Sequence, residues 1–245
     1  MRAGSAWIDR LSRLTSLSVD EQALLEQAAA APRLYAAQEA LAKVGDPADF
    51  VYVVLDGMAC EFKLLPDGRR QILAYLLAGD MSDPRQPLVP HWNHAMCVLW
   101  PARVALLPRD LVHRLEQRPG LARAIGRYSL VKQATMREWL VNVGHRTAFE
   151  RTSHLLCEIY VRLEAVGLTR DHSFDLPLTQ AELGDTLALS AVHVNRTLME
   201  LRRLKIVTFQ NRHVVIHDYE TLRAGAGFDP QYLHPEPGST IGPTN

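Results

Sequence analysis

The sequence contains no long hydrophobic run. None of its apolar stretches approaches the ~20 residues that a helix needs to cross a bilayer. Residues 1–9 also lack the apolar core of a secretory signal. The length of 245 residues and the composition suit one large or two modest domains of an ordinary globular protein. We therefore expect a cytoplasmic protein that has no membrane partner.

Cysteine is scarce. The chain has three cysteines, far apart and without CxxC spacing, which argues against a disulfide framework or a zinc finger: Cys60, Cys97 and Cys157. His91, His94 and Cys97 could in principle bind a metal or haem, as could His154 with Cys157. Because no fourth ligand accompanies either group, loop histidines and packed cysteines are the favoured interpretation. We predict no metal and no cofactor.

Motifs for catalysis are missing as well. The sequence has no GxSxG nucleophile elbow, no HExxH and no phosphate-cradling loop. Asp80 and Asp83 could be imagined as paired carboxylates, but two acids near a proline loop are usually solvated. The sequence therefore predicts a protein that is not an enzyme.

The formal net charge is zero, yet the positive charge is unevenly placed. Residues 190–216 contain five basic side chains against Glu200 alone, a local net charge of +4. Attraction to DNA depends on where the positive charge lies and not on the sum over the molecule. The neutral total is therefore compatible with binding DNA through this segment.

Residues 179–204 carry the pattern of two short helices joined by a tight bend. Thr179 and Glu182 match a capping box, which starts a helix, and Gly184 permits the partner helix to approach closely. Ser190 can cap the second helix, whose inward stripe is Val194, Leu198 and Leu201. The opposite side carries Val192, Asn195, Arg196, Met199 and Arg203. This layout is typical of a helix-turn-helix that places its second helix in the major groove.

The segment from Leu178-Thr179-Gln180 through Val192-His193-Val194-Asn195-Arg196-Thr197-Leu198 to Leu201-Arg202-Arg203 resembles the Crp/Fnr superfamily of bacterial transcription regulators. The resemblance continues into residues 204–216, which look like the two-stranded wing after the recognition helix. It covers about the last third of the chain. An earlier β-rich region matches more weakly.

The resemblance implies roles for individual residues. Arg196 aligns with the arginine that reads guanine, Asn195 could read a base edge or hold a phosphate, and His193 lies near the helix start. Val192 replaces a base-reading glutamate and could contact a thymine methyl group, which changes the expected target sequence. Ala188 replaces a glycine and is strained if the bend needs a positive φ. The expected DNA-binding residues are Thr179, Gln180, Ser190, Val192, His193, Asn195, Arg196, Asn211 and Arg212.

Residues 35–107 alternate turn signals with short apolar runs such as 50–55, 61–65 and 71–77. This texture indicates a small antiparallel sandwich or barrel. The resemblance implies a jelly-roll of the cyclic-nucleotide-binding type here. The predicted fold class is α+β: a β-roll, a long helix and a winged helix-turn-helix.

The expected effector pocket is Gly79, Asp80, Asn93 and His94. The glutamate that grips the ribose in family members is missing, and Asn93-His94 stands where an arginine and a small hydroxyl residue would hold the phosphate. A buried phosphate needs a cation or several amides. We therefore expect no tight binding of cyclic AMP, while another effector remains unidentified. The segment before Tyr35 has no cysteine, which excludes the iron–sulfur centre of oxygen-sensing members.

Residues 121–142 show one apolar seam at helical spacing: Leu121, Ile125, Tyr128, Val131 or Lys132, Thr135 and Trp139. The resemblance implies pairing of two such helices across a dimer axis, whereas spacing alone equally allows packing on the helix's own β-domain. The expected division is a β-roll with short N-terminal helices (1–118), a dimerisation helix (119–143), a DNA-binding domain (144–222) and a disordered tail (223–245).

The sequence thus favours a homodimeric regulator that binds an inverted repeat of double-stranded DNA and works with RNA polymerase. The alternative is a β-roll signalling module that acts through protein contacts, with a winged domain that no longer binds DNA. The two differ in salt dependence, because DNA binding weakens steeply with salt.

Overall fold

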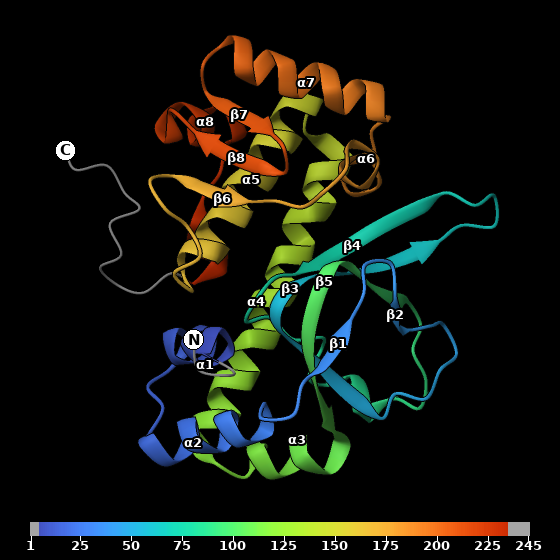
Figure 1. The fold of residues 1–245 in the computed structure, drawn as a ribbon, viewed down its shortest axis with the longest axis vertical. Helices are drawn as coiled ribbons and strands as arrows, with labels where there is room; N and C mark the ends of the chain where they lie inside the picture. Colours follow the sequence, from blue (N-terminus) through green and yellow to red (C-terminus); the bar gives the residue numbers. More distant parts are fainter. Residues whose placement is uncertain (1–4, 235–245) are drawn as a thin grey trace.

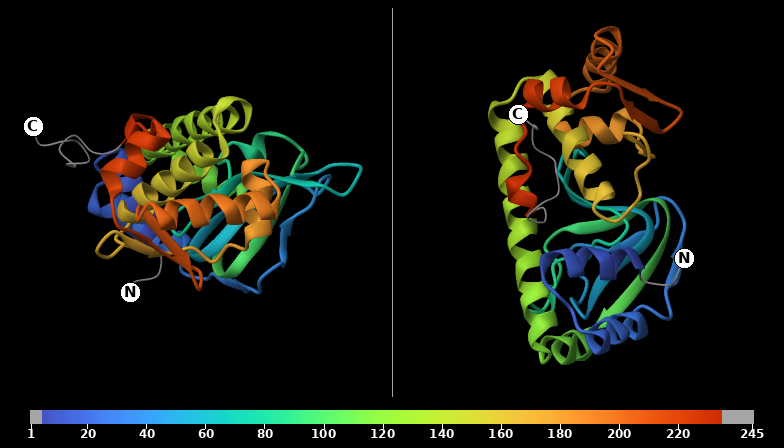
Figure 2. Two further views of the ribbon diagram at one scale, coloured as in Figure 1. Left: turned by 90° about the horizontal axis from the view of Figure 1, so that it is seen from above. Right: turned by 90° about the vertical axis from the view of Figure 1, so that its left-hand side faces the viewer.

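A computed structural model describes residues 5–234 of the chain. The N-terminal half is an antiparallel β-roll flanked by short helices, and the C-terminal part is a three-stranded sheet with helices around it (Figure 1). Along one side of the molecule runs a single long helix, α4, with the β-roll and the C-terminal part both on its other side (Figure 2). The predicted α+β class and order of parts are confirmed.

The β-roll has the strand order β1-β5-β3-β4, and β2 pairs with β5. Its strands are β1 (Arg33–Tyr35), β2 (Ala40–Ala42), β3 (Phe50–Leu64), β4 (Arg70–Leu76) and β5 (Ala95–Pro108), with the short 3-10 helix η1 (Gln86–Leu88) before β5. The helices α1 (Ser5–Leu14), α2 (Val19–Ala28) and α3 (Arg109–Glu116) cover one end of the roll. Ser18 and Glu21 form a capping box that starts α2.

The long strand β3 differs from the sequence prediction. The runs 50–55 and 61–65 are predicted as two strands, and the turn signal between them is Asp56-Gly57, but the chain continues through this dipeptide with a bulge. Gly57 has φ +86, and a Cβ there would lie 2.3 Å from the carbonyl oxygen of Pro101. The glycine therefore serves the close approach of β5 and does not reverse the chain.

Helix α4 (Pro119–His145) begins with proline at its first position, where the missing N–H costs nothing. Four residues of its predicted seam pack within the chain: Leu121, Ile125 and Tyr128 lie with α1 in one core cluster, and Trp139 lies in another with α5. This part of the seam is thus used for packing on the helix's own chain. A second apolar stripe stays exposed on the opposite side of α4.

The C-terminal part starts with α5 (Ala148–Glu164), whose capping box is Thr147 with Glu150. Its remaining elements are β6 (Ser173–Asp175), α6 (Gln180–Leu187), α7 (Ala191–Arg203), β7 (Val207–Gln210), β8 (His213–Ile216), α8 (Tyr219–Ala226) and η2 (Pro230–Leu233). The wing has three strands, because β6, from before α6, adds to the expected pair in the order β6-β8-β7.

Residues 223–234 differ from the expected disordered tail, because they form the end of α8 and the short helix η2. Phe228 is buried, and the Tyr232 hydroxyl donates to Glu158 at 2.9 Å. The Phe228 ring also lies 5.1 Å from the His154 ring of α5, and these two aromatic contacts hold the segment on the protein. The rest of the expected tail, 235–245, lies outside the described residues.

Candidate nucleic-acid interface

The bend between α6 and α7 has the geometry of a helix-turn-helix. Thr179 caps α6 in a capping box with Glu182, and the Ser190 hydroxyl accepts the His193 amide at the start of α7. A Cβ on Gly184 would lie 2.5 Å from the Leu189 carbonyl oxygen, so only glycine allows this close turn. Ala188 ends α6 with φ 53 and ψ 45, in the left-handed region. The bend therefore needs the positive φ that was expected to strain an alanine.

Helix α7 buries one face and presents the other. Val194 and Leu201 are fully buried, whereas Val192 is 80% exposed and Met199 is 66% exposed. Asn195 and Arg196 are exposed as well. The exposed face borders an open groove, which we call the α7 groove, lined by Gln180, Ala191, Val192, Asn195, Arg196, Met199, Glu200, Arg202 and Arg203. Four predicted site residues thus converge on one surface: Gln180, Val192, Asn195 and Arg196.

Thr179 and Ser190 act as helix caps and lie outside this groove lining. His193 lies beside Arg196, and its ring nitrogen Nε2 contacts the guanidinium of that arginine. This contact restricts the side-chain conformations open to Arg196.

Arg202 and Glu200 also line the groove but were not among the expected contacts. Helical spacing from Val192 could have found Arg202, because positions 192, 195, 199 and 202 share one face.

The wing tip turns towards the β-roll. Asn211 and Arg212 both have positive φ, 53 and 62, which is the pattern of a tight two-residue hairpin. The Arg212 guanidinium lies over the Trp100 ring of β5, 4.8 Å from its centroid. Asn211 and Arg212 border a cavity shared with Asp56 and Trp100 and do not line the α7 groove. The structure therefore separates the wing-tip residues from the other predicted contacts.

Helix α6 rests on strand β4 of the β-roll. Arg70 pairs with Asp185 at 2.8 Å, and the Gln71 amide donates to the Thr186 carbonyl at 3.1 Å. The Tyr75 hydroxyl makes a short hydrogen bond with the Thr186 hydroxyl. The β-roll thus holds the first helix of the helix-turn-helix and thereby sets where α7 points.

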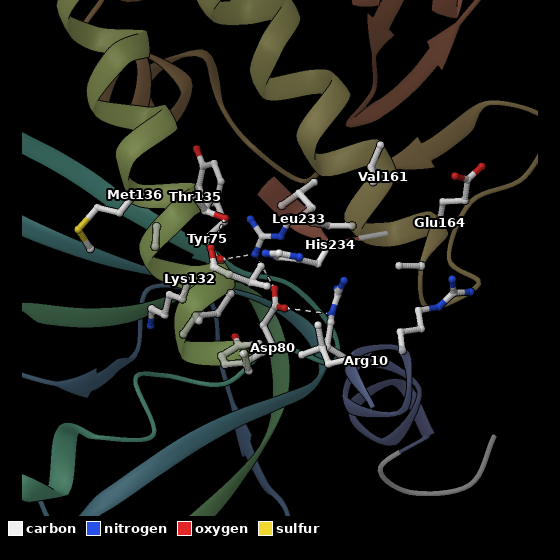
Figure 3. A pocket seen from close by; sticks show the side chains of 18 of the residues that line it. Arg10, Tyr75, Asp80, Lys132, Thr135, Met136, Val161, Glu164, Leu233 and His234 are labelled. Carbon is white, nitrogen blue, oxygen red and sulfur yellow. Dashed lines mark hydrogen bonds and ion pairs between the residues drawn. The ribbon is translucent and has the colours of Figure 1, made fainter. Parts of the chain in front are cut away.

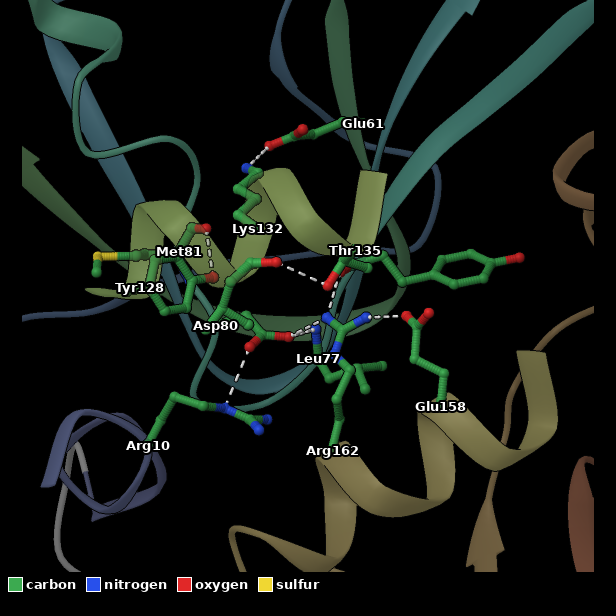
Figure 4. Close-up of polar contacts among 12 residues, drawn as sticks. Arg10, Glu61, Leu77, Asp80, Met81, Tyr128, Lys132, Thr135, Glu158 and Arg162 are labelled. Atoms are coloured by element: carbon green, nitrogen blue, oxygen red, sulfur yellow. Dashed lines mark hydrogen bonds and ion pairs between the residues drawn. The ribbon is translucent and has the colours of Figure 1, made fainter. Parts of the chain in front are cut away.

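A cavity of about 370 Å³ lies between β4, α1, α4 and α5 (Figure 3). Asp80 stands on its wall and accepts from Arg162 at 2.6 Å and from the Leu77 amide at 2.9 Å, while Arg10 lies 3.2 Å away (Figure 4). Burial alone would raise the pKa of Asp80, but the charges of Arg10 and Arg162 and these hydrogen bonds outweigh it and hold the pKa below its usual range. The Asp80 carboxylate therefore stays ionised, and Arg10 and Arg162 already balance its negative charge.

The predicted effector residues do not share one cavity. Gly79 (φ +89) lies against α1, where a Cβ would come 2.5 Å from the Ala6 carbonyl oxygen. Asn93 contacts His94, whose Nε2 lies 3.8 Å from a carboxylate oxygen of Glu61. Glu61 in turn pairs with Lys132 of α4. Burial lowers the pKa of His94 despite that carboxylate. Asp80 lines the 370 Å³ cavity, whereas Gly79, Asn93 and His94 do not.

Within residues 5–234, no group of three or more His, Cys, Asp or Glu side chains is arranged to hold a metal ion. No helix in that range combines the length and the apolar character that crossing a membrane requires.

Two protein families match this chain, one over the C-terminal part and one over the β-roll. Residues 150–224 match the Crp-like helix-turn-helix domain, and residues 32–118 match the cyclic nucleotide-binding domain. A probable transcriptional activator of Rhizobium leguminosarum is 30% identical over 73% of this chain and 74% of its own. The transcriptional activator protein FnrL of Cereibacter sphaeroides is 31% identical over 80% and 81%.

A solved structure gives the same result for the fold. FixK2 from Bradyrhizobium japonicum superimposes with a TM-score of 0.71 at 26% identity, covering 79% of this chain and 96% of FixK2. The two domain matches, the relatives and the shared fold agree with each other. The chain belongs to the Crp/Fnr family of transcription regulators, which are not enzymes.

Proposed function

We propose that this regulator binds an inverted-repeat operator as a cytoplasmic homodimer and acts on RNA polymerase. In this proposal, residues 1–118 form the effector-type domain, residues 119–143 form the dimerisation helix, and residues 144–222 form the DNA-binding domain. The observation that carries the proposal is the α7 groove, where Asn195, Arg196, Arg202 and Arg203 lie on one exposed face. Arginines on an exposed helix face suit both phosphate contacts and guanine readout.

Dimerisation is supported by the outer stripe of α4, which we define as Leu130, Ala134 and Val141. Leu130 is 59% exposed and Val141 is 42% exposed, and the neighbouring Leu140 is 70% exposed. Spacings of four and seven residues place the three on one face, as in a two-helix seam. Two reading helices held one duplex turn apart, about 34 Å, would match an inverted repeat.

The proposal includes weak or absent binding of cyclic AMP. A phosphate beside Asn93-His94 would meet the Glu61 carboxylate, 3.8 Å from His94. The nearby Lys132 is already paired with that carboxylate. No net positive charge is left in this group to offset the desolvation of a phosphate. Titrating the protein with cyclic AMP by calorimetry should therefore give no heat at micromolar concentrations.

The central experiment is selection of bound sites from a random DNA pool, followed by titrations of the selected site with wild type and Arg196→Ala. We expect the substitution to cost about 1–3 kcal/mol and to relax base preference at one position of each half-site. Arg170→Ala is the matched control, because the Arg170 side chain is 92% exposed on the same domain and lies outside the α7 groove.

Unchanged affinity and base preference in Arg196→Ala would contradict the assignment of the groove. The same titrations at several salt concentrations test the rival role as a protein-contact module. A regulator that neutralises several phosphates loses affinity steeply with salt. A flat salt response would favour the rival.

A further inference from the structure

Two of the three cysteines face each other across the β-roll. Cys60 of β3 and Cys97 of β5 are directly opposed in the antiparallel register, and their sulfur atoms are 3.6 Å apart. Both thiols are free and buried. A disulfide requires sulfurs about 2.05 Å apart on residues whose Cα atoms are about 4.4–6.8 Å apart. Opposed residues of an antiparallel pair lie within that Cα range. Joining the two sulfurs therefore needs only side-chain movement.

The two thiols differ in a way that assigns their roles. Cys97 is 6% exposed, whereas Cys60 is fully buried. The hydrogen bond with Cys60 and the charge of Arg70 lower the pKa of the Cys97 thiol, and burial opposes them. The same hydrogen bond, together with burial, raises the pKa of Cys60. Cys97 is thus the thiol that can ionise and react with an oxidant, and Cys60 is the thiol within reach to resolve the product.

The pair lies in the contact between the β-roll and the helix-turn-helix. Cys60 is opposed on its other side by Tyr75 of β4, whose hydroxyl bonds Thr186 of α6. Both cysteines belong to the core cluster that also contains Leu183 and Leu187 of α6. A change at the two sulfurs is therefore made in the core that α6 shares with the β-roll, one strand away from the Tyr75–Thr186 contact.

We propose that Cys60 and Cys97 are a redox modification site at which hydroperoxides form a reversible intramolecular disulfide. The Cys97 thiolate attacks a peroxide oxygen and breaks the O–O bond, giving a sulfenic acid and an alcohol or water. The Cys60 thiol then attacks the sulfenic sulfur, forming the S–S bond and releasing water. Overall two thiols lose two electrons and two protons, and one peroxide is reduced. This proposal does not depend on the identity of the operator or of any effector.

The test uses the reduced full-length chain exposed to hydrogen peroxide. Wild type is expected to lose the mass of two hydrogen atoms and to fall from three free thiols to one. A non-reduced digest should contain a linked peptide pair spanning residues 60 and 97, and dithiothreitol should restore all three thiols. Cys157→Ser is the matched control, because Cys157 is equally buried but lies on α5, and it should form the same disulfide.

Single variants separate the two roles. Cys60→Ser should accumulate a sulfenic acid on Cys97 that a dimedone probe captures, whereas Cys97→Ser should form neither product. Cys60→Ala and Cys97→Ala serve if a buried serine prevents folding, with circular dichroism as the check. Three thiols that persist under peroxide, a disulfide between two chains, or equal loss of thiols in Cys97→Ser and wild type would each overturn the proposal.

Discussion

Ala188 adopts the left-handed backbone conformation that the bend between α6 and α7 requires. The αL conformation brings Cβ too close to the following carbonyl oxygen and costs a non-glycine residue about 1–2 kcal/mol. Ala188 nevertheless adopts φ 53 at the end of α6, because its amide donates to Gly184 and Leu189 must return over that glycine. The surrounding contacts thus offset the strain of the bend.

Ala188→Gly should therefore stabilise the protein by about 1 kcal/mol, since the αL strain disappears while the hydrogen bond from the residue 188 amide to Gly184 is kept. Ala181→Gly, in the first turn of α6 on its exposed side, is the control and should instead destabilise, by up to about 1 kcal/mol. Urea unfolding of the two variants beside wild type measures both effects. Destabilisation by Ala188→Gly would show that the bend is held in some other way.

At the scale of the elements, α4 has two apolar faces, of which one is packed and the other is exposed. Leu121, Ile125, Tyr128 and Trp139 pack against the helix's own chain, whereas the outer stripe lies exposed. The sequence spacing detected only the first face, because its residues are larger and more regular. Dimerisation therefore has to be tested on the outer stripe and not on the predicted seam.

Leu130→Glu should raise the dimer dissociation constant at least about tenfold, which corresponds to about 1.4 kcal/mol. The reason is that a two-fold axis along α4 would bring two carboxylates together in an apolar seam. Leu34→Glu is the control, because Leu34 is 80% exposed on β1, away from α4. Sedimentation velocity measures the populations of monomer and dimer in each variant. A wild-type protein that stays monomeric at high concentration would contradict the dimer itself.

Local signals explain which elements could be predicted from sequence. The caps at Thr179 and Ser190 act within three residues, and so the boundaries of α6 and α7 were visible in the sequence. The bulge at Gly57 depends on Pro101 of another strand, and the third wing strand β6 pairs with the distant β8. Such elements are decided by contacts that the neighbouring sequence does not contain.

In the site, too, local signals could be predicted from the sequence, whereas contacts with distant residues could not. The exposed face of α7 follows from helical periodicity, and the structure places Asn195 and Arg196 on it. The position of the wing tip does not follow from the hairpin sequence, because it depends on Trp100 of the β-roll beneath Arg212. Likewise the residues grouped around Gly79 and His94 were adjacent only in an approximate alignment, and their side chains serve different neighbours.

At the scale of the whole molecule, Asp80 joins three separate parts of the chain. Its carboxylate meets Arg10 of α1 and Arg162 of α5, and it lies beside the β-roll strand β4. Arg162 also pairs with Glu158 at 2.9 Å and donates to the Tyr75 carbonyl. The N-terminal helix, the β-roll and the C-terminal part therefore share one buried set of charges, and we expect them to unfold together.

Asp80→Asn should destabilise the protein by about 3 kcal/mol at pH 7, because two buried guanidinium groups lose their shared partner. The folded-state pKa of Asp80 is lowered, so its contribution is complete above the unfolded value of about 4 and is lost as pH falls through the folded value. The difference between wild type and Asp80→Asn should accordingly narrow in acid. Asp67→Asn, which removes an exposed carboxylate paired with Arg69, should change little at any pH. Urea unfolding from pH 7 down to pH 3 measures these differences, and a constant gap would mean that the Asp80 carboxylate is not what holds the three parts together.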